Sequence, residues 1–313
     1  MINFRKELGR LKYLLLEDLP YRGVAARVPE MRKALWESVP RLPALPEAKN
    51  HDVELHMLCG NRDTAMGIFA SWSLLRFLNG KGRLYVHSDG TLTADDIESW
   101  SAVTPGLVVV TKEEADQRVA EVLKGKTRHL YRWRCDYGMS AQVVDAHFFG
   151  DAQKIVSFDS DVLAFHCPDS FIASVRSKAM EFTWCQDFQD AYSAPPQVIN
   201  DVFKIEVPER YNGGFMVTPR FSEETFQELD EIMETMEQDG RMDIDHYWSA
   251  QTYYAILAAR RGRTNMMPSN YTTHKGRTRR SAPVRHYVGV DQIRFRYFTE
   301  GIPRLLRQIG QGV

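Results

Sequence analysis

The sequence predicts an α/β fold, in which a mostly parallel central sheet is flanked by helices on both faces. Apolar runs of strand length alternate with helical patterns between residues 53 and 123. A further apolar run at 154–158 ends in two aspartates, and ligands bind such sheets at the carboxyl ends of the strands. The composition, with 43% hydrophobic and 26% charged residues, is typical of a globular protein.

The first 50 residues predict a helical N-terminal extension that leads into a single domain covering residues 51–313. Apolar residues recur there at helical spacing: Phe4, Leu8, Leu11 and Leu15. Such a helix either packs on its own domain or lies on a membrane surface, and the pattern is compatible with both. Three prolines between residues 40 and 46 predict a stiff linker.

Three strand–helix pairs open the main domain. The expected strands cover residues 53–59, 83–87 and 107–110, and the expected helices cover 64–78, 95–100 and 113–123. Cys59, Gly60 and Asn61 follow the first strand, at the edge where a parallel sheet binds ligands. This turn lacks the Gly-x-Gly-x-x-Gly spacing of a dinucleotide-binding fold, which disfavours a Rossmann enzyme.

The most informative stretch runs from Lys154 to Leu163. Asp159 and Asp161 follow the predicted strand with Ser160 between them, so strand alternation turns both carboxylates to the same side. Two neighbouring carboxylates repel each other and favour a hard divalent cation, Mg²⁺ or Mn²⁺, whose shell phosphate oxygens complete. The alternative interpretation is a polar turn after a strand.

The second informative stretch covers residues 210–217, where Asn212, Gly213 and Gly214 lead into an apolar strand. Glycine at the start of a strand lets a ligand approach the backbone, but Asn-Gly is also a strong hairpin-turn signal, so both interpretations stay open. The other expected elements are a helix at 139–149, a strand at 180–184, a loop with weak helix over 186–207, and helices at 222–240 and 248–257. Asp243 or Asp245 is expected to cap the last of these.

Charge is distributed unevenly along the chain. The section from Arg260 to Val313 carries 12 Lys or Arg against 2 Asp or Glu, while the formal net charge of the whole chain is −1. A basic section beside an acidic body suggests an anionic ligand such as phosphate, pyrophosphate or nucleic acid. Within this section residues 274–280 have no apolar period and predict a mobile loop, shortly before His286.

Several classes of protein are disfavoured. No run of about 18 apolar residues predicts a transmembrane helix, and the N-terminus has no apolar signal core. The four cysteines include no Cys-x-x-Cys pair, which disfavours structural zinc. We therefore expect a cytoplasmic protein, whose one candidate membrane contact is the N-terminal helix.

Taken in order, these features resemble the GT-A glycosyltransferases, most closely the retaining, family-eight-like group that uses sugar nucleotides. The shared order is a first strand and polar turn, a helix ending Ser73-Leu74-Leu75, an Asp-x-Asp after an apolar strand, an Asn-x-Gly strand, a helix with Gln, and a late His-x-x-Gly. The resemblance runs from about Val53 to Phe298. It implies transfer of a sugar from a nucleoside-diphosphate sugar, with a UDP-sugar expected, to an unidentified glycan, lipid or protein acceptor. It also implies retention of configuration and a Mn²⁺ or Mg²⁺ cofactor.

The resemblance further implies roles for individual residues. Asp159, Asp161 and His286 are the implied metal ligands. The implied donor-binding residues are Cys59, Gly60, Asn61, Arg134, Asp159, Ser160, Asn212, Gly213, Gly214, Gly289 and Arg294. The implied catalytic residue Gln251 falls on the family's Asp-Gln pair, but Ala250 replaces the aspartate, so Asp245 or Asp243 is the expected substitute.

The chemistry of glycosyl transfer fits this set of residues. The departing nucleoside diphosphate gains negative charge, which a divalent cation and arginines can stabilise. The basic section would then act as a lid over the diphosphate, or else it is a solvated tail. Two other functions stay open: a nucleotidyltransferase with a two-carboxylate metal site, and a non-enzymatic nucleic-acid-binding protein. The first lacks a glycine-rich basic loop after the first strand, and the second lacks a recognised nucleic-acid motif.

Overall fold

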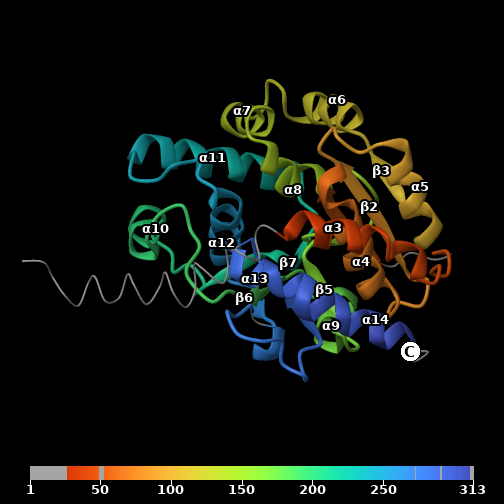
Figure 1. Cartoon of the computed structure of the whole chain (residues 1–313). Coiled ribbons are helices and arrows are strands. Elements are labelled where there is room, and N and C mark those ends of the chain that lie inside the picture. Colours follow the sequence, from red (N-terminus) through yellow and green to blue (C-terminus); the bar gives the residue numbers. More distant parts are fainter. Residues whose placement is uncertain (1–26, 49–52, 272, 290, 311–313) are drawn as a thin grey trace, which may run out of the picture.

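A computed structural model describes residues 27–48, 53–271, 273–289 and 291–310 of the chain (Figure 1). The amphipathic pattern at Phe4–Leu15, with the membrane contact that it suggests, lies outside the described residues. In the described part of the chain no helix is long and apolar enough to cross a membrane.

A seven-stranded sheet forms the centre of the described structure. Its strand order is β3-β2-β1-β4-β7-β6-β8. The strands are β1 (Val53–Cys59), β2 (Gly82–Ser88), β3 (Val108–Val110), β4 (Lys154–Phe158), β6 (Phe182–Gln186), β7 (Tyr211–Pro219) and β8 (Thr264–Met266). Four neighbouring pairs are parallel, whereas β7 runs antiparallel to both β4 and β6. The predicted α/β fold with a mostly parallel sheet is therefore confirmed.

Helices cover both faces of this sheet (Figure 1). They are α3 (Val28–Trp36), α4 (Thr64–Leu75), α5 (Ala94–Val103), α6 (Lys112–Leu123), α7 (Arg128–Asp136), α8 (Ala141–Val144), α9 (Asp169–Arg176), α10 (Pro196–Phe203), α11 (Glu223–Asp239), α12 (Ser249–Arg261), α13 (Asp291–Arg296) and α14 (Ile302–Gly310). Figure 1 shows α6, α7 and α11 along one side of the molecule and α9 and α14 along the other.

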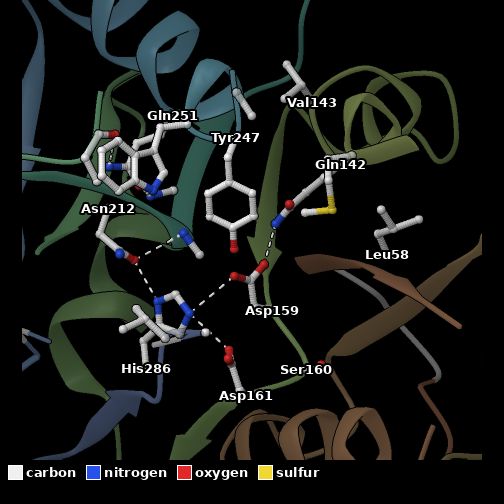
Figure 2. Close-up of a pocket in the computed structure, with 18 of the residues that line it drawn as sticks. Leu58, Gln142, Val143, Asp159, Ser160, Asp161, Asn212, Tyr247, Gln251 and His286 are labelled. Atoms are coloured by element: carbon white, nitrogen blue, oxygen red, sulfur yellow. Dashed lines mark hydrogen bonds and ion pairs between the residues drawn. The ribbon is translucent and has the colours of Figure 1, made fainter. Parts of the chain in front are cut away.

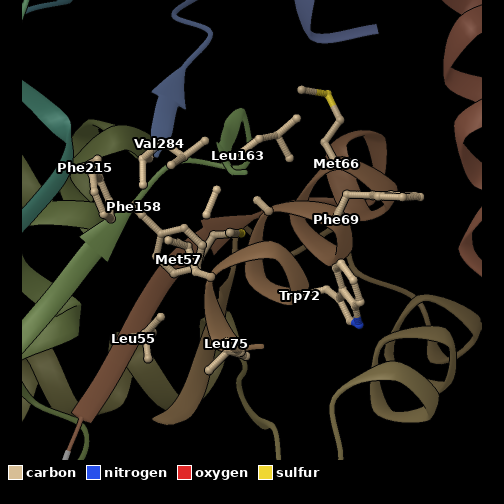
Figure 3. Close-up of a cluster of buried hydrophobic side chains, with 14 of the residues drawn as sticks. Leu55, Met57, Met66, Phe69, Trp72, Leu75, Phe158, Leu163, Phe215 and Val284 are labelled. Atoms are coloured by element: carbon tan, nitrogen blue, oxygen red, sulfur yellow. The ribbon is translucent and has the colours of Figure 1, made fainter. Parts of the chain in front are cut away.

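Strand alternation divides the apolar side chains between two cores. The first core packs against α4 and α9 and includes Val156 and Phe158 of β4 and Val217 of β7. Met216, the neighbour of Val217 in β7, points to the opposite face and belongs to a second core with α7, α11 and α12. Figure 3 shows the first core, in which Phe69 of α4 is fully buried. A side chain of this kind stabilises the fold by about 1.5–3 kcal/mol when it is fully buried.

A second, two-stranded sheet was not predicted from the sequence. It pairs β5 (Val162–Ala164) with β9 (Val284–His286) in antiparallel fashion, with Val162 opposite His286. Both strands are only three residues long, too short for a periodic pattern to stand out. This pairing joins the segment after Asp161 to the basic C-terminal section.

Residues 28–45, which include the predicted linker, pack against the main core. Leu35, Val39 and Leu42 are buried in the same core as α4, and the prolines lie around a short 3₁₀ helix at Val39–Arg41. The expected domain boundary at residues 50/51 falls among residues that the structure does not describe, and it stays a prediction.

Three predicted elements differ from the structure. The helix expected at 139–149 is broken into α8 and two 3₁₀ turns, because Asp145 turns inward to the guanidinium of Arg134, at 2.5 and 2.6 Å. The strand expected at 180–184 lies two residues later. α10 forms within the segment expected as a loop with weak helix. Neither Asp243 nor Asp245 caps a helix, because α12 begins at Ser249; Asp243 instead accepts a turn hydrogen bond from the backbone of Asp245 at 2.9 Å.

Candidate active site

A cavity of about 810 Å³ lies at the carboxyl ends of β1 and β4. It is the position at which open α/β sheets bind ligands, because strand connections leave there in opposite directions. Most residues selected from the sequence line it together: Cys59, Gly60, Asp159, Ser160, Asp161, Asn212, Gly213, Gly214, Gln251, His286, Gly289 and Arg294. These residues come from five separate stretches of the chain.

Two backbone pairings assemble the centre of the cavity. The N–H of Asp159 donates to the carbonyl of Gly214 at 2.9 Å, which extends the β4–β7 ladder by one residue. The N–H of Tyr287 donates to the carbonyl of Asp161 at 2.9 Å, which extends the β5–β9 ladder. The first pairing places Gly214 beside Asp159, and the second places His286 beside Asp161.

Asp159, Asp161 and His286 form what we call the carboxylate–histidine cluster (Figure 2). Nε2 of His286 lies 3.2 Å from Oδ2 of Asp159 and 3.0 Å from Oδ1 of Asp161. Asp161 and His286 are buried, whereas Asp159 is partly exposed to the cavity. The two carboxylates thus converge on one imidazole nitrogen. They do so through a turn after β4, in which the N–H of Val162 donates to the carbonyl of Asp159 at 3.1 Å, and not through the strand alternation that was expected.

The electrostatics of the cluster are dominated by its two carboxylates. Burial opposes a charged imidazolium at His286, but the carboxylates of Asp161 and Asp159 outweigh burial and raise its pKa to about 10. Burial likewise opposes the charge of Asp161, but His286 and Arg294 lower the pKa of this carboxyl below its ordinary value. Arg294 donates to Oδ2 of Asp161 at 2.6 Å. The cluster therefore attracts positive charge strongly.

The donor atoms of the cluster fit a divalent cation. Ligand atoms of the three side chains lie within 4.8 Å of one another, and two carboxylates with one imidazole suit Mn²⁺ or Mg²⁺. Oδ1 of Asp161 is buried, and among the described residues its partner is Nε2 of His286 at 3.0 Å. A buried carboxylate oxygen that shares its partner with a second carboxylate fits a metal ligand, because a divalent cation can take the place of the proton between them.

The absence of a side chain at Gly214 gives the cluster the room that it occupies. A Cβ atom at this position would lie 2.0 Å from Cε1 of His286 and 2.5 Å from Oδ2 of Asp159. At Gly213 the nearest atoms would lie at 3.9 Å, so a side chain fits there. The pairing of β6 with β7 shifts register at this point, and the two glycines belong to β7. The hairpin-turn interpretation of Asn-Gly-Gly is therefore wrong, and the close-approach interpretation fits.

Gln251 faces the cavity from the first turns of α12, but its amide is engaged. Its Oε1 accepts from the N–H of Gly213 at 3.0 Å, and its Nε2 donates to the carbonyl of Ala191 at 2.8 Å. Gln251 thus ties α12 to the glycine segment of β7. Ala250 lines the same wall without a carboxylate.

Four residues selected from the sequence do not line the cavity. Asn61 is exposed and its backbone N–H donates to Thr91. The next residue, Arg62, lines the cavity instead. Arg134 is buried and paired with Asp145 and Asp116, so its charge is already balanced. Asp243 and Asp245 are exposed in the turn before α12 and do not replace the missing carboxylate of the Asp-Gln pair.

Further lining residues were not identified from the sequence: Asp63, Asp89, Gln142, Asp187, Tyr247 and Trp248. Asp89 and Asp187 each follow a strand directly, so the rule that revealed Asp159 could have found them. Gln142 donates to Oδ1 of Asp159 at 2.5 Å from the broken helix. Tyr247 extends over the cavity with its hydroxyl toward Asp159 (Figure 2), and no sequence pattern indicated this.

The basic loop at 274–280 is anchored by a buried arginine. Arg285 is fully buried and donates to the carbonyls of His274 and Gly276, at 2.9 and 2.8 Å, and to Oγ1 of Thr278 at 2.7 Å. None of residues 274–280 lines the cavity. The loop thus has fixed contacts to the body of the protein without any ligand.

Comparisons with known proteins concern the fold. The sequence matches no protein-family model and no curated protein. The WbbM bifunctional glycosyltransferase superimposes with a TM-score of 0.56 at 12% identity, over 86% of this chain and 53% of that one. Mouse xyloside xylosyltransferase 1 superimposes with a TM-score of 0.51 at 11% identity, over 77% of this chain and 98% of that one. The chain therefore has a GT-A-like glycosyltransferase fold, as its sequence resemblance predicts.

Proposed function

We propose that this protein is a metal-dependent glycosyltransferase, which moves a sugar from a nucleoside-diphosphate sugar to an acceptor. The observation that carries the proposal is the carboxylate–histidine cluster, which lies in an 810 Å³ cavity at the ligand-binding edge of a GT-A-like sheet. A UDP-sugar donor and a retaining outcome are the finer parts of the proposal, and the resemblance of the motifs in sequence order supports them.

The residues around the cluster have distinct tasks in this proposal. Asp159, Asp161 and His286 would hold Mn²⁺ or Mg²⁺, which supplies positive charge next to the diphosphate as the sugar–phosphate bond breaks. Arg294 lies against Asp161 and can donate two hydrogen bonds to a phosphate. The bare backbone of Gly213 and Gly214 lets the donor sugar come close. Together these groups favour the charged leaving group over its intact ester.

Apolar side chains at the cavity support a carbohydrate acceptor. Tyr247 and Met139 line the cavity and are 69% and 42% exposed, and Trp248 lies beside them. Aromatic faces of this kind stack on the apolar faces of sugar rings, with the hydroxyls left free for hydrogen bonds. An acceptor sugar bound there would reach the donor from the side of α12.

A calorimetric titration with UDP tests the proposal. UDP should bind in the presence of Mn²⁺ and lose most of its affinity in EDTA, and Asp161→Ala should abolish the difference while the protein stays folded. Equal affinities with Mn²⁺ and with EDTA contradict the metal-dependent mechanism. Incubation with a panel of sugar nucleotides and NMR of the anomeric proton of the product then identify the donor sugar and the stereochemical outcome.

We place the activity in the cytoplasm, with the N-terminal segment as the candidate membrane contact. Both points follow from the sequence pattern, and binding of the full chain to lipid vesicles tests the second. A nucleic-acid-binding function receives little support from the contacts of the basic section, because Arg285 is buried and Arg304 donates to the backbone of Arg279 and Arg280.

A further inference from the structure

A chain of hydrogen bonds leads from Asp187 to the carboxylate–histidine cluster. Asp187 directly follows β6 and is 4% exposed. Its Oδ1 accepts from the backbone N–H of Phe188 at 2.6 Å and from the hydroxyl of Thr273 at 3.0 Å. Its Oδ2 accepts from Nδ2 of Asn212 at 2.6 Å. The carboxylate is therefore held in place by two donors while its other oxygen faces Asn212.

The amide of Asn212 can adopt one orientation in this setting. A carboxylate accepts hydrogen bonds and donates none, so Asn212 must turn its NH₂ group toward Asp187. Its Oδ1 then accepts from the N–H of Gly214 at 3.1 Å and faces Nδ1 of His286 at 2.8 Å. Reversing the amide would break the bonds at both of its ends.

The orientation of the amide in turn decides which face His286 offers to the cluster. An amide oxygen cannot donate, so Nδ1 of His286 must carry a proton, and Nε2 is the nitrogen that points at Asp159 and Asp161. A metal-bound histidine needs this arrangement, with one nitrogen donating to a fixed acceptor and the other free to bind the cation.

We propose that Asp187 is a positioning residue for the metal site: acting through Asn212, it fixes the ring of His286 so that the Nε2 lone pair faces the cation. The inference rests on the proposed metal-dependent function and deepens it. Asp187 lies among the residues of the cavity wall, but both of its oxygens are occupied by protein donors, so its action on the cation passes through Asn212 and His286.

Asp187→Asn should exchange the donors and acceptors in the hydrogen bonds that link residue 187, Asn212 and His286, with almost no change in side-chain volume. The N–H of Phe188 requires an acceptor, so the new amide turns its oxygen to Phe188 and its NH₂ group to Asn212. Two NH₂ groups then oppose each other, and Asn212 must rotate and present its own NH₂ to Nδ1 of His286. Nδ1 of His286 then has no acceptor, and the ring is no longer held with Nε2 toward the cation. Changes in such outer contacts typically weaken metal binding by about 10–100-fold.

A second change should restore the original order of donors and acceptors. In Asp187→Asn combined with Asn212→Asp, the amide at 187 donates to the carboxylate at 212, which accepts from Gly214 and from Nδ1 of His286. We expect the double variant to recover most of the lost affinity, as a coupled pair of sites should. Thr273→Val is the matched control, because it removes one donor to Asp187 but leaves the bond to Asn212 intact.

The experiment measures Mn²⁺ affinity by calorimetry without nucleotide, together with ¹⁵N NMR of His286 in the Mg²⁺-loaded protein. The expected results are a proton on Nδ1 in the wild type and in Thr273→Val, a loss of about 10–100-fold in Asp187→Asn, and recovery in the double variant. Circular dichroism checks folding.

Unchanged Mn²⁺ affinity in Asp187→Asn overturns the proposal, and so does a folded double variant that binds no better than Asp187→Asn. If Asp187→Asn fails to fold, the double variant and Thr273→Val still decide the question. If the metal measurements agree and no sugar nucleotide is turned over, the glycosyltransferase function fails while the role of Asp187 stands. A wild-type protein that binds no Mn²⁺ contradicts both.

Discussion

Two clusters of ionisable groups differ in their access to the cavity. The inner cluster consists of Glu54, His56, His87, His147 and the partly buried Arg220, and none of its members lines the cavity. The carboxylate–histidine cluster follows β4 and opens into the cavity. Both contain carboxylate and imidazole, so the types of residue alone do not distinguish a structural cluster from a binding site.

The difference lies in how the carboxylates are partnered. Glu54 accepts from the backbone N–H groups of Asp151 and Ala152, at 2.8 and 3.1 Å, and from Arg220. Burial opposes its charge, but His56 and these donors outweigh burial and lower the pKa of Glu54 to about 2. In the other cluster Oδ1 of Asp161 and Oδ2 of Asp159 converge on the same nitrogen of His286, at 3.0 and 3.2 Å, and all three residues line the cavity. A carboxylate that several protein donors satisfy away from the cavity indicates a structural role, and two carboxylates that converge within the cavity indicate a ligand.

The largest expected effect is a difference in the free energy of unfolding between a variant of the inner cluster and a variant of the carboxylate–histidine cluster. Glu54→Gln leaves the partly buried guanidinium of Arg220 without its counter-charge, and breaking a buried ion pair costs up to about 3–5 kcal/mol. Asp161→Asn should cost much less, because His286 can release its proton when one carboxylate is lost. Urea unfolding of the two variants in EDTA measures both values. Mn²⁺ at about 100 times its dissociation constant should add about 2.7 kcal/mol to the wild type and nothing to Asp161→Asn. Equal destabilisation by the two substitutions contradicts the distinction.

The second prediction concerns acid stability, which we assign to the inner cluster. Burial lowers the pKa of His56, His87 and His147 below the ordinary value of 6.5. Protonation is thus easier in the unfolded chain. The contribution of these three imidazoles should be complete above pH 6.5 and fall as the pH drops below it, by about 1.4 kcal/mol per pH unit for each imidazole. Glu54 adds a further loss as the pH falls from 4.5 toward 2.

Urea unfolding between pH 8 and pH 5 tests this assignment. Nδ1 of His147 accepts from the N–H of Phe221 at 3.0 Å, so protonation there breaks a hydrogen bond. His147→Gln should reduce the dependence of the unfolding free energy on pH by about 1.4 kcal/mol per pH unit, which is the contribution of one imidazole. A slope unchanged by His147→Gln would show that acid lability has another origin.

The third prediction compares the two neighbouring glycines of β7. Gly214→Ala places a Cβ atom 2.0 Å from His286, whereas Gly213→Ala meets its nearest atoms at 3.9 Å. We expect Gly214→Ala to weaken Mn²⁺-dependent UDP binding at least about 100-fold, or about 2.7 kcal/mol, and Gly213→Ala to bind nearly as the wild type does. Calorimetry measures both affinities. Similar losses in the two variants would mean that the glycines serve backbone freedom rather than space for the cluster.

The sequence predicted those parts of the fold and site that depend on local patterns. Two aspartates directly after an apolar run were enough to select Asp159 and Asp161, although a turn and not strand alternation orients them. Asn-Gly-Gly marked the close approach at Gly214. Asp187 was missed although it directly follows β6, where the rule applied to Asp159 could have found it. Tyr247 was missed because it reaches the site through long-range packing. It also misassigned Arg134, because basic character near the site does not reveal that Asp145 and Asp116 already neutralise it.

The basic loop at 274–280 likewise shows that composition does not reveal long-range contacts. Substitutions in this loop have the smallest expected effect, which is on UDP affinity. From its composition the loop was expected to act as a mobile lid on the diphosphate. In the structure its backbone is held by Arg285 and by Glu300, which accepts from the N–H of Thr278 at 2.9 Å. The side chains of Arg277, Arg279 and Arg280 are exposed and lie outside the cavity lining.

We expect the combined replacement of Arg277, Arg279 and Arg280 by alanine to change UDP affinity by less than about twofold, or about 0.4 kcal/mol. Exposed charges that do not touch the ligand are largely screened at physiological salt. Arg294→Ala is the contrasting variant, because Arg294 contacts Asp161 within the cavity wall, and it should weaken binding far more. Calorimetry with UDP and Mn²⁺ gives both values, and hydrogen exchange at 274–280 should be the same with and without ligand. A tenfold loss in the triple variant, together with protection of this loop on binding, would restore the lid and would mean that Arg285 holds only one of two positions of the loop.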